Sequence, residues 1–405
     1  MIRLLRTAAA AALAVSVLFP AAVLGQSSGT AGEHELELNL ATPAGLDSET
    51  PPGVDLTSGF IEGLDTGAGP WTKGEGEGEW LVVPIPFKNG LLGVGVQVGA
   101  ARLYKPASRP EQDKASLFGI GAMYAEGGSW AVAGGDRRYW ADERIRSTLA
   151  AGVGEINYPI RLDTENLYVQ VPVFQTFSGA LFQLGYQVRD NLWISGGYKR
   201  ASSKVTLGEF DAGISSFLDL ERTYDLALAS IKLDWDTRSD QFFPTSGALV
   251  SASVDLADTA LGAYRDYQVY ELSYNGYRAV DERNTLAWRV SGKTVGGDPP
   301  FFSLAWYGSG VDLRGYAPGT YIGRSLAAAQ AEWRWQATQR IGLVAFGGVG
   351  GVWGDAPVFE QDDFLPAGGL GLRYRLTEKF RVNFRIDYAW GKDDEVLLIS
   401  VGEAF

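Results

Sequence analysis

Alternation of apolar and polar residues is the feature that most constrains the fold of this 405-residue chain. It is clearest over residues 380–391, where one face carries Phe380, Val382, Phe384, Ile386, Tyr388 and Trp390 and the other Arg381, Asn383, Arg385, Asp387 and Ala389. A period of two is typical of β-strands. The strands of a soluble β-sandwich usually have a narrower apolar face, which points to the core. A membrane barrel instead turns a wide apolar face to lipid and the polar face to its lumen.

Similar segments recur from residue 92 to the end of the chain, and helical periodicity is nearly absent. An even number of strands would place both ends of the barrel on the periplasmic side. We therefore expect an all-β fold, a 16-stranded antiparallel transmembrane β-barrel of the outer membrane. The predicted strands are 92–104, 115–126, 128–140, 145–158, 165–175, 179–188, 191–202, 222–235, 247–257, 265–279, 283–295, 325–336, 341–353, 367–376, 380–391 and 394–403.

Short and long connections between these strands alternate, which gives the two barrel ends different characters. The short connections at Gly127-Gly128, Asp190 and 377–379 are predicted to lie at the periplasmic end. The longer ones at 203–221, 296–324 and 354–366 are predicted to lie at the extracellular end. The connection 236–246 is the exception, because it is long and is still predicted at the periplasmic end.

The start of the chain predicts export. Arg3 and Arg6 precede an apolar run over residues 7–24, which is typical of a cleaved signal peptide over residues 1–25. No later stretch approaches the roughly 20 apolar residues of a membrane helix. Of the structures that satisfy the backbone in lipid, only a closed barrel then remains.

Composition excludes several function classes. The chain has no cysteine and one histidine, His34, so disulfides, thiolate metal sites and histidine-dependent catalysis have no candidate inside the barrel. We expect no enzyme activity, no metal and no cofactor. The net charge of −13 becomes −15 without Arg3 and Arg6 (33 basic against 48 acidic residues), which argues against nucleic acid as a partner.

The long connection before residue 325 contains Val311-Asp312-Leu313-Arg314-Gly315-Tyr316. Arg314 is a permanent cation with a fixed fork of donors, and Gly315 allows backbone conformations that larger residues resist. The Arg-Gly-Tyr core resembles the Arg-Gly-aromatic motif of the sixth extracellular loop in the BamA/TamA and two-partner-secretion superfamily, the bacterial surface antigen barrels. The resemblance implies an inward-folded loop whose arginine meets acidic residues on the inner wall.

Two neighbouring strands resemble the family's inner wall. Glu332, followed by Trp333 and Arg334, resembles the glutamate of the strand after the loop. Phe346-Gly347-Gly348-Val349-Gly350 resembles the family's Phe-x-Asp-x-Gly motif, with Gly348 at the acidic position. Asp387, which also faces inward, is expected to replace that acid. The alternative is an ordinary charged lumen network, as in porins, formed by Glu332, Arg334, Arg373, Arg375, Arg385 and Asp387.

Two further segments carry the resemblance. Asp236, Arg238, Phe243, Pro244 and Gly247 are similar to the family's periplasmic turn before the ninth strand. Pro244 and Gly247 are expected to shape this turn, with Asp236 and Arg238 paired across it. At the other segment, Leu397, Ile399, Val401 and Phe405 are predicted to share one face, which resembles the C-terminal aromatic signal used in barrel assembly. Glu403 interrupts that face.

Residues 26–90 are rich in Pro, Gly, Glu, Thr and Ser and show little periodicity. Family members usually carry periplasmic POTRA domains at this position. So many breakers predict instead a largely disordered periplasmic tail without a POTRA domain. The expected organisation is therefore a signal peptide over 1–25, a tail over 26–90 and a surface antigen barrel over 91–405.

The resemblance implies insertion or translocation of polypeptide at the outer membrane, through a weak seam between strands 92–104 and 394–403. Glycines 93, 95 and 99 would weaken that seam. Expected partners are outer-membrane lipid and lipopolysaccharide, and an unfolded outer-membrane or secreted polypeptide. A periplasmic partner is a further candidate that the sequence does not identify. The alternative is a passive channel or structural barrel; a lipid-handling or adhesion role has no sequence signature.

Overall fold

A computed structural model describes residues 78–89, 92–105, 114–141, 143–164, 167–207, 222–308, 312–316, 320–354, 361–392 and 394–405. The predicted signal peptide, most of the tail predicted to lack a POTRA domain, and His34 lie outside the described residues. The same holds for Val311.

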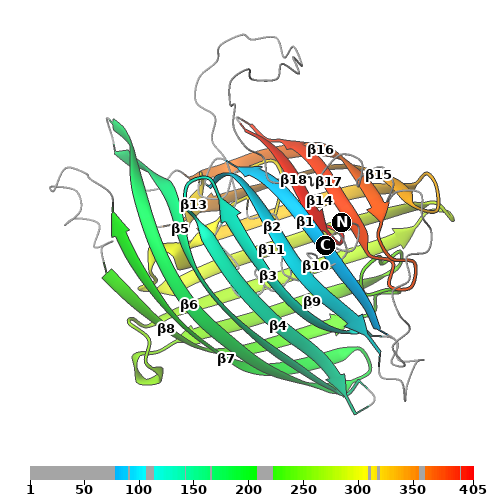
Figure 1. The fold of residues 1–405 in the computed structure, drawn as a ribbon, viewed down its shortest axis with the longest axis horizontal. Coiled ribbons are helices and arrows are strands. Elements are labelled where there is room, and N and C mark those ends of the chain that lie inside the picture. The colour runs from blue at the N-terminus through cyan, green and yellow to red at the C-terminus, as the bar shows by residue number, and fades with distance from the viewer. Residues whose placement is uncertain are drawn as a thin grey trace, which may run out of the picture.

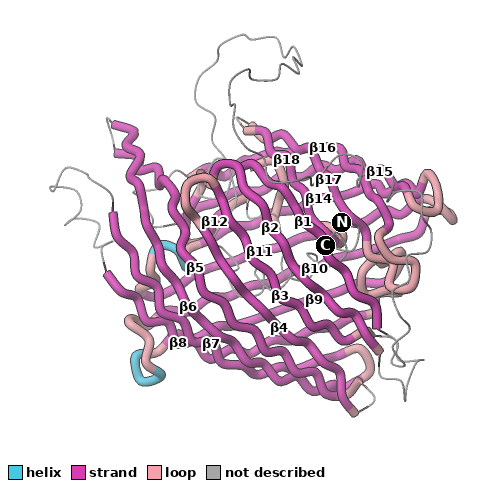
Figure 2. The backbone as a smooth tube through the Cα atoms, in the orientation of Figure 1, coloured by secondary structure: helices cyan, strands magenta, loops and turns pink. Residues whose placement is uncertain are grey.

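One antiparallel sheet of sixteen strands curves into a barrel (Figure 1), as the sequence predicts. Figure 2 shows how completely strands make up the described chain. The first eight strands are β1 (Gly78–Asn89), β2 (Gly93–Tyr104), β3 (Ser116–Ala125), β4 (Trp130–Trp140), β5 (Ile145–Thr164), β6 (Leu167–Arg189), β7 (Leu192–Leu207) and β8 (Arg222–Asp236). The remaining eight are β9 (Gly247–Ala257), β10 (Tyr267–Ala279), β11 (Asn284–Gly297), β14 (Ser325–Gln336), β15 (Ile341–Trp353), β16 (Asp362–Arg375), β17 (Asn383–Trp390) and β18 (Glu395–Val401).

The connection between β11 and β14, residues 298–324, contains its own small sheet of β12 (Ala305–Trp306) and β13 (Ile322–Gly323). We call this connection the arginine loop. The two helical elements among the described residues are the 3-10 turns Thr259–Leu261 and Phe301–Ser303. In the described part of the chain no helix combines the length and apolar character needed to cross a membrane.

The two faces of the barrel wall differ as the alternation predicts. On β14, Trp333 and Trp335 are exposed on the outside, whereas Gln330, Glu332 and Arg334 are buried on the inside. Exposed large apolar side chains recur on the outer face of many other strands, among them Leu272 of β10 and Leu370 of β16. An apolar outer wall of this extent is the surface that a barrel presents to lipid.

The first strand was missed by the sequence analysis. β1 occupies residues 78–89, inside the segment predicted to be a tail, and it pairs with β2 over its whole length without a register shift. Pro84 and Pro86 argue against a strand by pattern, but prolines are tolerated in a strand at the edge of a sheet. Within the described residues, the barrel therefore begins at Gly78 rather than at residue 91.

The predicted strands 165–175 and 179–188 are wrong as separate elements, because both belong to β6, a single strand of 23 residues. Ser178, which lies in the predicted gap, pairs with Val153 of β5 and with Ser202 of β7. The predicted total of sixteen is therefore correct because one strand was missed and another was counted twice.

Contacts between connections identify the two barrel ends. Lys114, before β3, binds Asp236 at the end of β8 with its Nζ 2.7 Å from Oδ2, so these residues mark one end, here called the turn end. Leu92, between β1 and β2, packs in one cluster with Phe301 and Trp306 of the arginine loop, so these mark the opposite, loop end. Gly127-Gly128 follows β3 and lies beside Leu92 at the same end as the arginine loop, although the sequence predicts it at the opposite end.

The alternating run at 380–391 is only partly a strand. Arg381 has a φ of +51°, and β17 begins two residues later at Asn383. Phe380 and Val382 are buried in an apolar cluster at the turn end, so the prediction that they face lipid is wrong. Tyr388 and Trp390, further along the strand, are exposed on the outer face as predicted.

Among the described residues, no hydrogen-bonded ladder closes the barrel. The sheet order starts at β1 and stops at β18, and no ladder joins these two strands, although they lie side by side in Figure 1. The predicted seam between 92–104 and 394–403 is corrected accordingly, because β2 pairs fully with β1 and β3. The seam lies between β1 and β18.

Candidate functional site

Arg314, in the arginine loop, is buried against the inner wall. Its guanidinium donates from Nη1 to Asp387 Oδ2 at 2.6 Å and from Nη2 to Gln330 Oε1 at 3.2 Å. Nη2 also donates to the carboxylate of Glu332. The side chains of Arg314, Glu332 and Asp387 are fully buried. A planar fork of donors suits this arrangement, because it reaches acids on two different strands at once.

The ring of Phe346 on β15 lies under the same guanidinium, with the Arg314 Cζ 3.6 Å from the ring centroid. A cation over an aromatic face is stabilised by the ring quadrupole, and more strongly so when water is excluded. Arg314, Glu332, Phe346 and Asp387, each proposed from sequence, are thus brought together in one place.

Gly315 and Tyr316 shape the loop beside Arg314. Gly315 has a φ of +115°, and a Cβ there would lie 2.9 Å from the Cβ of Ala367, so both conformation and space require glycine. The buried Tyr316 hydroxyl donates to the carbonyl of Pro366 at 2.5 Å and accepts from the backbone N–H of Lys392 at 3.0 Å. These contacts join the loop to β16 and to the connection after β17.

Arg314 belongs to a closed circuit of alternating charges, here called the charge ring. Glu332 accepts from Arg334 Nε at 2.9 Å, and Asp387 accepts from Arg373 Nη1 at 2.5 Å. Glu403 completes the circuit, 2.9 Å from Arg373 Nε and 3.9 Å from Arg334 Nε. In order around the ring the members are Arg314, Glu332, Arg334, Glu403, Arg373 and Asp387.

Every side chain of the charge ring is at most 3% exposed. Each charge has a neighbour of opposite sign on both sides, which offsets the large cost of removing ions from water. Burial raises the pKa of the Glu403 carboxyl, but Arg373 and Arg334 lower it more, so its pKa lies below the ordinary value. The two arginines therefore favour the charged form of Glu403.

Gly348 departs from the family motif for a reason that the structure supplies. A Cβ at this position would lie 2.6 Å from Cδ1 of Leu313 and within contact distance of the Ala329 carbonyl. Leu313, the residue before Arg314, is fully buried. Glycine thus leaves room for the arginine loop, while Asp387 supplies the second acid from β17.

The turn between β8 and β9 has the predicted ion pair. Arg238 donates from Nε to Asp236 Oδ1 at 2.9 Å and from Nη2 to Oδ2 at 3.1 Å. Gly247 has a φ of +87°, and a Cβ there would lie 2.0 Å from the Thr237 carbonyl oxygen. Phe243 and Pro244 are buried, and the guanidinium of Arg381 lies 4.8 Å from the Phe243 ring. The turn is thus packed against the connection before β17.

Phe405 and Glu403 do not lie where the sequence places them. β18 ends at Val401, and Gly402, with a φ of +91°, redirects the chain. Phe405 consequently does not share the face of Leu397 but lies against Arg334 and Tyr277 of the inner wall. Glu403 interrupts no lipid-facing surface, because its carboxylate belongs to the charge ring.

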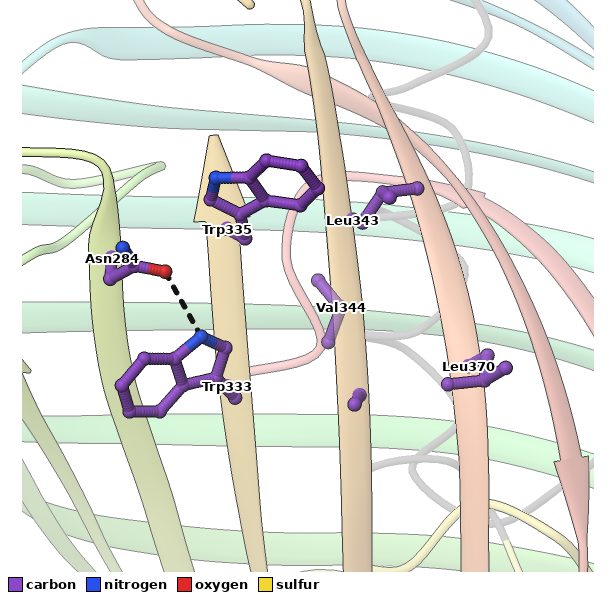
Figure 3. A pocket seen from close by; sticks show the side chains of 7 residues that line it. Asn284, Trp333, Trp335, Leu343, Val344 and Leu370 are labelled. Atoms are coloured by element: carbon purple, nitrogen blue, oxygen red, sulfur yellow. Dashed lines mark hydrogen bonds between the residues drawn. The ribbon is translucent and has the colours of Figure 1, made fainter. Parts of the chain in front are cut away.

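A hollow of about 320 Å3 lies on the outer face, away from the charge ring (Figure 3). Its walls include Trp333, Trp335 and Leu370, and the indole Nε1 of Trp333 donates to Asn284 Oδ1 at 3.0 Å. The apolar lining and the outward position fit contact with lipid chains and offer no group for chemistry.

Several residues of the site escaped the sequence analysis. Gln330 faces inward two positions before Glu332, but it was not predicted as a partner of Arg314, because the resemblance implies acidic partners. Lys114, the partner of Asp236, lies far away in sequence and has no local signal. The break at Gly402 was detectable in principle, since a glycine after an apolar strand commonly ends it.

Comparison with known proteins gives one family. Residues 169–405 match the family model described as the Omp85 superfamily domain, which is more than half of the chain. No curated protein sequence matches.

Three solved structures have similar folds. BamA from Haemophilus ducreyi lacking POTRA domains 1-3 is 14% identical with a TM-score of 0.54, over 81% of this chain and 69% of that chain. CdiB from Escherichia coli is 12% identical with a TM-score of 0.56, over 82% and 62%. CdiB from Acinetobacter baumannii is 11% identical with a TM-score of 0.52, over 80% and 59%. The chain thus spans less than two thirds of either CdiB, and such low identities show the fold alone.

Proposed function

Because the chain belongs to the Omp85 superfamily, we propose that it inserts polypeptides into the outer membrane or translocates them across it. In this proposal the loop end is extracellular, the turn end is periplasmic, and a signal peptide directs the chain to the membrane. The polypeptide enters at the seam between β1 and β18, while Arg314 holds the arginine loop against the inner wall.

The single observation that carries the proposal is the seam. Fifteen neighbouring pairs of strands form ladders, whereas β1 and β18 approach each other without one. Unpaired strand edges are templates for the addition of another strand. A barrel that inserts polypeptides needs such an opening, and a barrel that only conducts solutes does not.

Two prolines favour the open state of this seam. Proline has no backbone N–H. It is therefore tolerated within an uninterrupted ladder only at positions where the N–H of another residue would point away from the partner strand. Pro84 and Pro86 lie in the continuous ladder between β1 and β2. They therefore remove two donors from the edge of β1 that faces β18, and full closure of the seam by hydrogen bonds is disfavoured.

The role proposed for Arg314 is structural support of the opening strands. Its partners lie on β14 and β17, and Tyr316 adds contacts to β16 and to the connection after β17. In the sheet order β17 is next to β18, β16 follows it, and β14 is four strands away from β18. The arginine loop thereby braces the C-terminal side of the barrel from inside while the seam opens.

Reconstitution tests the proposal. The full chain is placed in liposomes, and the folding rate of an unfolded small outer-membrane barrel polypeptide is followed by its shift in electrophoretic mobility. We expect folding to be faster than in liposomes of the same lipid without the protein. An equal rate, together with free passage of small solutes through the protein, would instead support a passive channel.

A further inference from the structure

The residues after β18, 402–405, form a C-terminal segment that lies inside the barrel. Gly402 has a φ of +91°, and its N–H donates to the carbonyl of Asn383 at 2.7 Å. This turn ends the strand and directs the next residues toward the lumen. The segment is therefore neither a continuation of the barrel wall nor exposed to lipid.

Glu403 attaches this segment to two elements of the inner wall. Its carboxylate accepts from Arg373 Nε at 2.9 Å and from Asn383 Nδ2 at 2.7 Å. The same carboxylate lies 3.9 Å from Arg334 Nε. Both arginines also bind the acids that hold Arg314, since Arg334 binds Glu332 and Arg373 binds Asp387.

Phe405 fixes Arg334 from a second direction. The guanidinium of Arg334 lies 5.4 Å from the Phe405 ring and 5.6 Å from the Tyr277 ring. Its Nη2 donates to the backbone carbonyl of Phe405 at 3.1 Å. Arg334 is therefore held by the C-terminal segment and by Glu332 together.

The same segment follows the strand that borders the seam. Val401, the last residue of β18, is 6% exposed although it occupies the same side of the strand as the exposed Leu397. It belongs to a cluster with Leu81, Val83 and Ile85 from the inner face of β1. The turn end of β18 is thus covered by apolar side chains of β1, and the segment extends inward from this point.

We propose that Glu403 is a positioning residue that couples the C-terminal segment to Arg314. The coupling runs through Arg334 and Arg373, which share Glu403 on one side and orient Glu332 and Asp387 on the other. Release of the segment leaves both arginines without their common acid and weakens their hold on the partners of Arg314. Displacement of the arginine loop likewise loosens the segment at the end of β18.

This inference rests on the proposed function in one respect, namely that the coupling keeps the end of β18 in place while the seam opens. The coupling itself is a property of the resting barrel. It is measured without any polypeptide substrate, so that the two proposals can fail separately.

The test uses a reporter on the segment. The chain has no cysteine, so Ala404→Cys introduces a single thiol whose rate of reaction with a maleimide reports exposure of the segment. In the full chain in liposomes, Arg314→Ala is expected to raise this rate about 5- to 150-fold, the range of typical coupling between sites. Arg340→Ala removes an exposed pair with Glu378, outside the arginine loop, and serves as the control with an unchanged rate.

The reciprocal experiment completes the design. Thr320→Cys in the arginine loop is expected to react faster in the Glu403→Gln variant than in the parent. If Arg314→Ala does not fold, Arg314→Lys keeps the charge and loses the fork, and a smaller increase at Ala404→Cys is expected. An unchanged rate at Ala404→Cys in a folded Arg314 variant, or at Thr320→Cys in Glu403→Gln, would overturn the coupling, whatever the folding assay shows.

Discussion

Replacing Arg314 with alanine is expected to lower the free energy of unfolding of the barrel by roughly 3 kcal/mol, the lower end of the range for breaking a buried ion pair. The substitution leaves Glu332 and Asp387 buried without the cation that they share. Glu332 keeps Arg334, and Asp387 keeps Arg373 and Arg385, and this is why the upper end of the range is not expected.

Urea titration, followed by the electrophoretic mobility of folded and unfolded chain, measures this change. Arg314→Lys should recover only part of the stability, because an ammonium cannot reach Glu332, Gln330 and Asp387 in the geometry of a guanidinium. Arg340→Ala is the matched control, since its ion pair with Glu378 is exposed and exposed ion pairs contribute about 0 to 1 kcal/mol. Equal stability of Arg314→Ala and the parent would contradict the bracing role.

Restoring the family's acid with Gly348→Asp is expected to destabilise this barrel, although it would strengthen the match to the motif. Any Cβ at this position meets Leu313 at 2.6 Å and the Ala329 carbonyl closer still. Overpacking of a well-packed site costs about 1 to 3 kcal/mol. Gly348→Ala should show most of the same loss, because the clash begins at Cβ rather than at the carboxylate.

Gly347→Ala is the control for this prediction. Its Cβ would meet only the Ala367 carbonyl at 3.6 Å, an ordinary contact, so its midpoint of urea unfolding should match that of the parent. If Gly348→Asp were as stable as the parent, the account of why this chain carries glycine there would be wrong.

The sequence predicts best where local pattern and tertiary role agree. On β14, alternation alone separates the exposed Trp333 from the buried Glu332, because both faces are uniform along the strand. The Arg-Gly-Tyr motif likewise identifies Arg314, since a fork of donors and a glycine of positive φ are local requirements. Its two acidic partners, Glu332 and Asp387, then follow from their inward-facing positions on β14 and β17.

The failures have tertiary causes. β1 was missed because Pro84 and Pro86 are acceptable only at an open edge, which no local pattern reveals. β6 was divided because polar residues near Ser178 resemble a turn, yet both neighbouring strands continue across this point. Phe405 was assigned to the lipid face by parity, and the positive φ of Gly402 breaks that parity.

The central claim is that the polypeptide enters at the seam between β1 and β18. A reversible disulfide bond across this seam tests the claim most directly. β1 and β18 lie side by side, so a scan of cysteine pairs with one residue on each strand is expected to give at least one pair that forms a disulfide across the seam. Val82→Cys with Ala100→Cys, directly paired on β1 and β2, is the control in a seam that already has a ladder. Folding of the barrel polypeptide in liposomes is then compared before and after reduction.

We predict that the oxidised β1–β18 pair folds the polypeptide no faster than liposomes alone and that reduction restores the acceleration. The oxidised β1–β2 pair should remain as active as the parent. Full acceleration with the β1–β18 disulfide intact would contradict the account, because the polypeptide would then have entered the membrane without passing the seam.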